Sequence, residues 1–270
     1  MPSPRNIDTL LKHWAFRPGE VTARTVKARN GREVLQMRID MGIVQMETLL
    51  RPDGQRPGGA ETYYDYLVGE AVREGDDFRL NQEQCAEADR EFVQYYQRRL
   101  CWLSLREYRR AAQDADHSLA FMDFVHRHSP DEEWTLSHEQ YRPFVLFHRV
   151  QAGALAALQE NGPETAISEI NTGLARFRDL FARYDAVEQY ADDELVKRLE
   201  EMRESVRERY DVGRTLDEQL AEAVRAENFE LAARIRDQLR GRARSGGAGG
   251  GSAAGQPTLD SGTGGDSATR

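Results

Sequence analysis

From about Thr62 to Arg242 the sequence is an almost unbroken succession of helix-type segments, and this feature most constrains the fold. Apolar residues recur there three and four positions apart, which is the spacing of one face of an α-helix. Short breaks at Ser129-Pro130 and Asn161-Gly162-Pro163 divide the region, because glycine and proline end helices. The sequence therefore predicts a mainly α fold built from helical hairpins.

One helix start and one helix of unusual composition can be placed more closely. Asn81 is followed three residues later by Gln84, which is the pattern of a capping box at a helix start. The segment 191–210 is a highly charged helix that precedes the last part of the chain. We expect residues 187–212 to form a linker helix that carries a semi-independent C-terminal element.

Two of the helical segments have the character of a repeat. Each has an alanine early in its second helix, Ala111 and Ala166, and a leucine near the end, Leu119 and Leu174. Alanine lets two helices approach closely, and the leucine fills the groove between neighbouring hairpins. The pattern resembles the tetratricopeptide repeat, which implies a TPR-like helical body over 61–186 with a surface for a peptide or protein. An ordinary helical bundle with similar hairpins is the alternative.

The N-terminal part, residues 1–60, is the only stretch with strand-like patterning. Asn30-Gly31 favours the positive φ angles of a type I′ hairpin turn. Gly42 is a candidate β-bulge. Apolar residues alternate with polar ones after the turn, as in a strand with one buried face: Leu35, Met37, Ile39 and Met41. We expect a small β-hairpin or sheet.

Composition limits the remaining parts and the setting. Residues 243–270 are rich in glycine and serine and lack large apolar side chains, which predicts a disordered tail. The formal net charge of −9 argues against non-specific nucleic-acid binding. No apolar run approaches the roughly 20 residues that span a bilayer, and no convincing signal peptide is present. With only Cys85 and Cys101 and no CxxC, a cytoplasmic location is expected.

Residues 213–242 have the features of a short helical hairpin. An apolar stripe on a first helix is formed by Leu216, Leu220, Ala223 and Val224. Asn228 is a good N-cap for a second helix. In that helix Glu230 precedes Arg234 by four residues, in the orientation that favours a helical ion pair.

This segment resembles the UVR motif, the helical hairpin of the excision-repair proteins UvrB and UvrC. The positions that match are Leu216, Leu220, Ala223, Phe229-Glu230, Ala232-Ala233, Arg236-Asp237 and Leu239. In that family the resemblance implies that one hairpin pairs with another.

The second helix has more apolar surface than the first can cover. We expect Phe229, Ala232 and Ala233 to face the first helix, and a second stripe of Leu231, Ile235 and Leu239 to need another partner. Two such short helices are also marginal in isolation. We expect the hairpin to pair with another protein or with a second copy of itself. The alternative is that it docks on the body of its own chain. The predicted partner-binding residues are Leu216, Leu220, Phe229, Leu231, Ala232, Ala233, Ile235, Arg236 and Leu239.

No catalytic, cofactor or metal site is indicated. The chain lacks a GxxxxGK[ST] phosphate loop and an HExxH motif. Five histidines lie in the helical region near carboxylates, without repeated ligand spacing: His117, His126, His128, His138 and His148. Cys101 beside Trp102 is expected in the core. The acids and bases of the hairpin are nearly balanced, so direct nucleic-acid binding is not expected.

These features together predict a non-enzymatic protein–protein interaction adaptor. It would pair through the UVR-type hairpin and a TPR-like helical surface. The alternative is an accessory factor of nucleotide-excision repair that UvrB or UvrC recruits through the same hairpin. The sequence names neither the partner nor the pathway.

Overall fold

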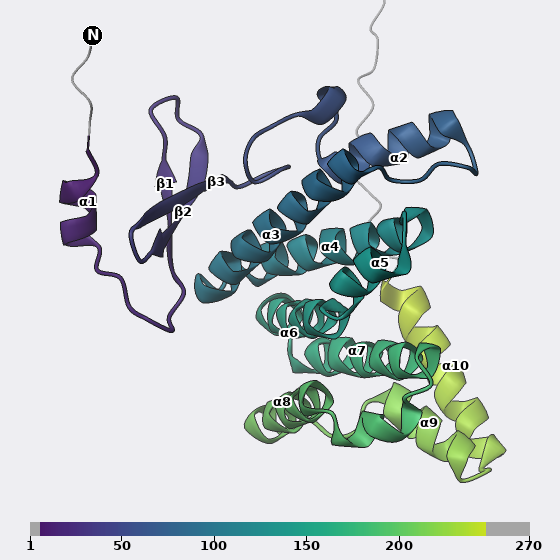
Figure 1. Ribbon diagram of the computed structural model, residues 1–270. Helices are drawn as coiled ribbons and strands as arrows, with labels where there is room; N and C mark the ends of the chain where they lie inside the picture. The colour runs from purple at the N-terminus through teal and green to yellow at the C-terminus, as the bar shows by residue number, and fades with distance from the viewer. Residues whose placement is uncertain (1–5, 247–270) are drawn as a thin grey trace, which may run out of the picture. The chain divides into compact units, whose positions relative to one another are not determined.

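The computed structural model describes residues 6–246 of the 270-residue chain, and the fold is mainly helical with one small antiparallel sheet, as predicted (Figure 1). The chain divides into two compact units. The first ends at Gly213 and contains the sheet and the helices up to α8, whereas the second begins at Arg214 and contains the C-terminal hairpin. From position 247 onward, the predicted disordered tail lies outside the described residues.

The first unit begins with a short helix and a three-stranded sheet. Helix α1 (Asp8–His13) precedes β1 (Thr22–Lys27), β2 (Glu33–Ile39) and β3 (Gly42–Glu47), which pair antiparallel in that order. One face of the sheet packs on helices, because Leu35 of β2 and Met46 of β3 share a buried cluster with Trp102. The predicted N-terminal β element is therefore joined to the helical body through a common core.

Two details of the sheet differ from the prediction. Only Gly31 of the Asn30-Gly31 pair has a positive φ, 82°, so the connection from β1 to β2 is not a type I′ turn. β2 ends at Ile39, and Gly42 is not a bulge but the first residue of β3, opposite Ile39. Met41 lies in the turn between them and is 89% exposed. The predicted alternation already fails within β2, because Arg38 is buried and Ile39 is exposed.

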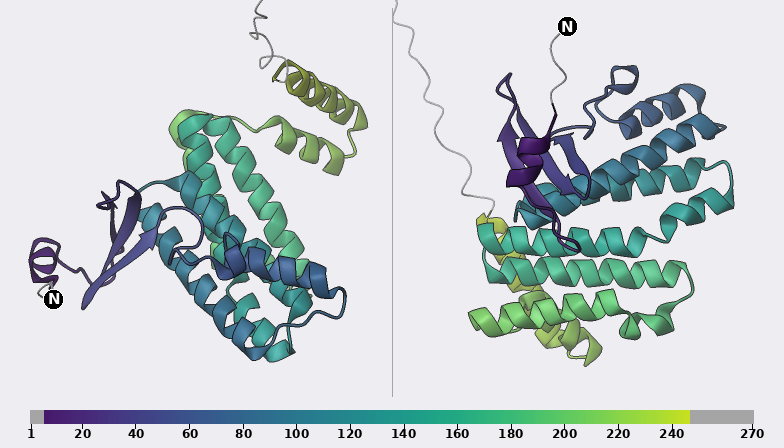
Figure 2. Two further views of the ribbon diagram at one scale, coloured as in Figure 1. Left: turned by 90° about the horizontal axis from the view of Figure 1, so that it is seen from above. Right: turned by 60° about the vertical axis from the view of Figure 1, so that its left-hand side comes forward.

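In the first unit the long helices α3, α4, α6, α7 and α8 lie side by side in chain order, and the short helix α5 packs on α4 (Figure 2). Helix α4 packs on α3 and α6, and α7 packs on α6 and α8. A one-turn 3₁₀ helix at Pro57–Gly59 precedes α2, and a second at Val187–Asp192 precedes α8. The helices are α2 (Tyr63–Glu74), α3 (Gln82–Ser104), α4 (Tyr108–His128), α5 (Glu132–Glu139), α6 (Arg142–Glu160), α7 (Pro163–Arg183) and α8 (Glu194–Tyr210).

Side-chain caps fix several helix starts of the first unit, and two of them bear on the prediction. The Gln84 backbone N–H donates to Asn81 Oδ1, and the Asn81 N–H donates to Gln84 Oε1, each at 2.9 Å, so the predicted capping box at the start of α3 is confirmed. The start of α5 was not predicted. There Asp131 accepts a hydrogen bond of 2.7 Å from the Trp134 N–H, which is an N-cap that the sequence also offers.

The two hairpins with repeat character are α3–α4 and α6–α7. Ala111 and Ala166 are fully buried, and Leu119 and Leu174 are nearly so, which places all four in the interior. Helix α5 lies between the two hairpins in the chain. The resemblance to the tetratricopeptide repeat stays a prediction.

Helix α8 is part of the body and not a linker, which corrects the prediction for 187–212. Val196, Leu199 and Val206 are buried, the first two in the cluster that α4, α6 and α7 also form. These residues follow one another at intervals of three and seven, so a narrow apolar stripe is enough to bury one face of a highly charged helix.

The second unit is the predicted helical hairpin. Helix α9 (Leu216–Arg225) is followed by α10 (Phe229–Gly246). The backbone of α10 continues four residues past the predicted boundary at Arg242. An uninterrupted helix is possible there because the segment Gly241–Arg244 contains only one glycine and no proline.

Candidate interaction site

The hairpin has well-defined helix ends. A capping box starts α9, since Thr215 Oγ1 accepts from the Glu218 N–H at 3.3 Å and Glu218 Oε2 accepts from the Thr215 N–H at 2.8 Å. Asn228 Oδ1 accepts from the Leu231 N–H at 3.1 Å, which confirms Asn228 as the cap of α10. In the turn between them Glu227 has a positive φ of 55°.

The interior of the hairpin is small and built largely from alanine. Ala223 of α9 and Ala232 and Ile235 of α10 are buried. Partly buried leucines surround them: Leu216, Leu220 and Leu239. Alanine lets the two helices approach, and Ile235 is the one large side chain that the hairpin buries among its described side chains.

The rotation of α10 differs from the prediction. Ile235 and Leu239 were expected to face away from α9, and Phe229 toward it. In the structure Ile235 is 4% exposed and Phe229 is 69% exposed. The stripe that faces α9 is Ala232, Ile235 and Leu239, at intervals of three and four, and Phe229 lies a quarter turn outside it.

Some apolar side chains therefore remain on the outside of the hairpin. Val224 is 51% exposed and Leu231 39%, beside Phe229. At 100° per residue, Val224 and Phe229 fall on the same side of an antiparallel hairpin, next to its turn, and Leu231 falls on the other edge of the buried stripe. We call Val224 and Phe229 the turn face.

The remaining predicted partner residues divide between the interior and the surface. Leu216, Leu220, Ala232, Ile235 and Leu239 hold the two helices together, and Ala233 is half-buried. Arg236 is exposed. Val224 was expected in the apolar stripe of α9, but it is 51% exposed and lies outside the buried cluster of the hairpin.

Arginine and glutamate side chains on the surface of the hairpin form ion pairs. Arg214 pairs with Glu222, and its hydrogen bond and charge lower the pKa of the Glu222 carboxyl. Arg234 Nη2 lies 3.8 Å from Glu230 Oε1, which confirms the predicted helical pair. These arginines have carboxylate neighbours, so they do not form the continuous cationic track that binds phosphates.

The histidines of the body have separate partners. His117 Nε2 lies 3.0 Å from Glu91 Oε1, and His138 Nε2 lies 2.9 Å from Asp89 Oδ1. His128 contacts the carbonyl of Phe78, His126 lies near Glu139, and His148 contacts Arg99. Within residues 6–246, no group of three or more histidine, cysteine or carboxylate side chains is arranged to hold a metal ion.

The two cysteines lie in the interior. Cys101 is fully buried beside Trp102, as predicted, and burial raises the pKa of its thiol to about 12. Burial likewise raises the pKa of Cys85 to about 11. Both thiols are therefore protonated at neutral pH, which is the inert form.

The second unit is thus a capped helical hairpin with its own small core and an exposed aromatic face, a class of element that recognises other proteins. The family model of the UvrB/UvrC motif matches residues 214–241, so this hairpin is a UVR motif. No curated protein and no solved structure matched the chain. Among the described residues, no helix is both long and apolar enough to cross a membrane.

Proposed function

We propose that the protein is a non-enzymatic cytoplasmic adaptor that binds a protein partner through the turn face of its UVR motif. The observation that carries this proposal is the exposure of Phe229, 69%, on a hairpin whose interior is already filled by other side chains. Burying a phenylalanine against a partner contributes about 1.5–3 kcal/mol.

The small size of the hairpin supports the same proposal. Its buried cluster contains two alanines and one isoleucine, and α9 has only ten residues. Helices of this length rarely persist alone in water, so a second apolar surface stabilises them. Binding that adds such a surface favours the folded hairpin by mass action.

The partner that fits best is another UVR hairpin, in a second protein or in a second copy of this chain. The turn face is apolar and small, and the rest of the hairpin surface has both arginine and glutamate side chains. A similar hairpin would offer a matching apolar patch with a mixed rim, which is the usual composition of an interface. The helical body would supply a further protein-binding surface.

A second candidate is an accessory role in nucleotide-excision repair, with UvrB or UvrC as the partner. The match to the UvrB/UvrC motif favours it. The same turn face would then bind the repair protein, and contact with DNA would come from that partner. The mixed charges of the hairpin argue against direct DNA binding.

Affinity capture with two matched variants tests the proposal. Phe229→Glu places a charge on the turn face at the first position of α10, where the helix dipole favours an anion. Ala221→Glu makes the same charge change at an exposed position on the outer side of α9. We expect Phe229→Glu to lose partners that wild type and Ala221→Glu both retain, and an identical partner set for all three would rule out the turn face.

DNA-binding titrations separate the two candidate functions. An adaptor should show no DNA affinity of its own, whereas a protein that contacts DNA directly should bind with an affinity that falls steeply as salt rises. Capture of UvrB or UvrC, lost in Phe229→Glu, would select the repair role over a general adaptor role.

A further inference from the structure

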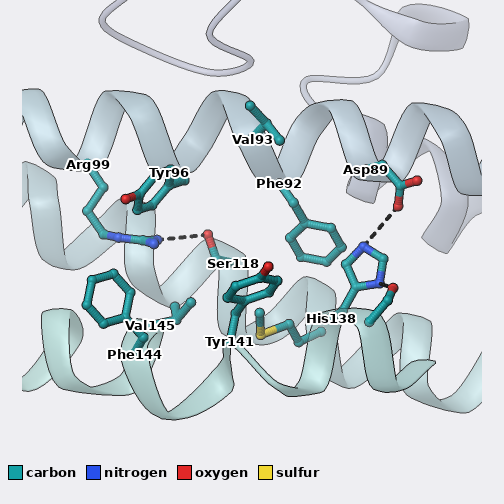
Figure 3. A pocket seen from close by; sticks show the side chains of 12 residues that line it. Asp89, Phe92, Val93, Tyr96, Arg99, Ser118, His138, Tyr141, Phe144 and Val145 are labelled. Carbon is teal, nitrogen blue, oxygen red and sulfur yellow. Dashed lines mark hydrogen bonds and ion pairs between the residues drawn. The ribbon is translucent and has the colours of Figure 1, made fainter. Parts of the chain in front are cut away.

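A pocket of about 590 Å³ opens between α3, α4, α5 and α6 of the first unit (Figure 3). Its volume lies within the roughly 300–1,000 Å³ typical of small-molecule sites. The walls are mainly apolar and aromatic, and are formed by Phe92, Tyr96, Met122, Tyr141, Phe144 and Val145. All belong to the first unit, whereas the UVR motif belongs to the second.

Arg99 forms one end of this pocket. Its side chain is 1% exposed and lies between Tyr96 and Phe144 (Figure 3). Nη1 donates to Ser118 Oγ at 3.1 Å, and Nε donates to His148 Nδ1 at 3.3 Å. Tyr96 and Phe144 are each more than a third exposed, so rotation of either ring widens the approach to the guanidinium.

In the described part of the chain Arg99 has no ion-pair partner of its own, since the one carboxylate whose charge acts on it, Asp114, is paired with Arg98. Burial and the neighbouring Arg99 lower the pKa of His148 to about 4, so this partner is neutral at pH 7. Among the side chains described within residues 6–246, no carboxylate forms an ion pair with Arg99, whereas the adjacent Arg98 is paired with Asp114 at 2.7 Å. Burial lowers the pKa of Arg99 to about 10 although the charge of Asp114 raises it, because desolvation disfavours the charged guanidinium.

We propose that this pocket binds a small organic acid, with its aromatic or aliphatic body against Phe92 and Phe144 and its carboxylate on Arg99. A guanidinium and a carboxylate form strong charge-assisted hydrogen bonds, and the low dielectric of a buried site strengthens them. The acid supplies a second negative charge, because among the described side chains Asp114 is the one carboxylate whose charge acts on both Arg98 and Arg99 and it is paired with Arg98.

The opposite end of the pocket sets the direction of the ligand. Asp89 lies there, with its Oδ1 2.9 Å from His138 Nε2 and 3.1 Å from Trp134 Nε1. Its side chain is half exposed, so its negative charge repels an acid group at this end. The carboxylate of the ligand is therefore directed toward Arg99.

Calorimetric titration of the full chain at pH 7 with 4-phenylbutyrate and its uncharged amide tests this proposal. The two probes have nearly the same shape and differ in charge. We expect the acid to bind at least roughly tenfold more tightly than the amide. Arg99→Gln retains a donor for Ser118 but removes the charge, and should reduce the affinity for the acid to that for the amide. Arg90→Gln, an exposed arginine of the same helix outside the pocket, should change neither affinity.

Three outcomes would overturn the proposal. They are equal binding of acid and amide, an acid preference that persists in Arg99→Gln, and no binding of either probe at millimolar concentration. If Arg99→Gln does not fold, Tyr141→Ala decides, because this pocket residue is 58% exposed and its loss should leave the fold intact. It should weaken both probes severalfold, and unchanged affinities would overturn the proposal equally.

Discussion

Individual positions of the body show how closely its helices pack. At Gly173 of α7 a β-carbon would lie 2.3 Å from Cγ2 of Val150 on α6, far inside van der Waals contact. Gly69 of α2 is exposed and has open space at the same point. The two glycines have the same local conformation in a helix but different surroundings.

Gly173→Ala should therefore destabilise the protein by about 1–3 kcal/mol, because the added methyl group overpacks the contact with α6. Gly69→Ala should instead stabilise it by about 0.5–1 kcal/mol through helix propensity. Urea unfolding of both variants measures the two free energies. A gain of stability in Gly173→Ala like that in Gly69→Ala would contradict the close approach of α6 and α7. Stability restored by adding Val150→Ala to Gly173→Ala would confirm the contact.

His148 makes stability depend on pH. Its pKa is lowered from 6.5 to about 4 by burial and by Arg99, so below pH 6.5 the unfolded chain takes up a proton that the folded chain does not. Stability is therefore lost as pH falls from 6.5 toward 4, by at most about 3 kcal/mol. His148→Gln should lose less over that interval than wild type, while His126→Gln, at an exposed position, should behave as wild type does in thermal melts. Parallel curves for all three would contradict this role.

At the scale of the elements, local signals were predictable and rotations were not. The caps at Asn81 and Asn228 depend on neighbours within three residues, so the sequence contains all that determines them. The rotation of α10 about its axis depends on which of two apolar stripes packs against α9. One stripe contains Phe229 and the other Ile235, and both have the spacing of a helix face. Packing against small side chains decides between them, and single-sequence spacing does not describe packing.

The packing of α8 and the pocket beside Arg99 also depend on contacts between helices that are distant in the sequence. The charged residues of α8 suggested a linker, because charge is visible in the sequence and the contact of Leu199 with α6 and α7 is not. The pocket beside Arg99 was also missed, since its lining comes from α3 through α6. A buried arginine without an ion-pair partner can be recognised only after those helices are placed in space.

The placement of Ile235 predicts that the hairpin unfolds separately from the body. Ile235→Asp puts a charge into the small core of the hairpin, at a cost of several kcal/mol that two short helices cannot offset. Hydrogen exchange should show lost protection over residues 216–240 and unchanged protection over α3 to α8. Phe229→Ala, on the surface, should leave both regions protected. Equal protection in wild type and Ile235→Asp would place Ile235 outside the core.

At the scale of the whole molecule, the chain is a folded body followed by a separate recognition element. The first unit has its own buried clusters, from Leu35 in the sheet to Leu199 in α8, and ends at Gly213. A chain that stops at Gly213 should therefore fold and melt within about 3 °C of the full chain, since no described core residue of the body is removed. A markedly lower melting temperature would show that the hairpin is structural.

The central claim, that the turn face of the UVR motif binds the partner, can be tested directly by hydroxyl-radical footprinting of the complex captured from cells. Phe229 is 69% exposed, so it should be oxidised readily in the free chain and be protected in the complex. Val72 of α2, which is 79% exposed on the body, should react equally in both. Protection of Phe229 with Val72 unchanged is the predicted result. An unchanged oxidation rate at Phe229, with protection elsewhere in the chain, would contradict the claim.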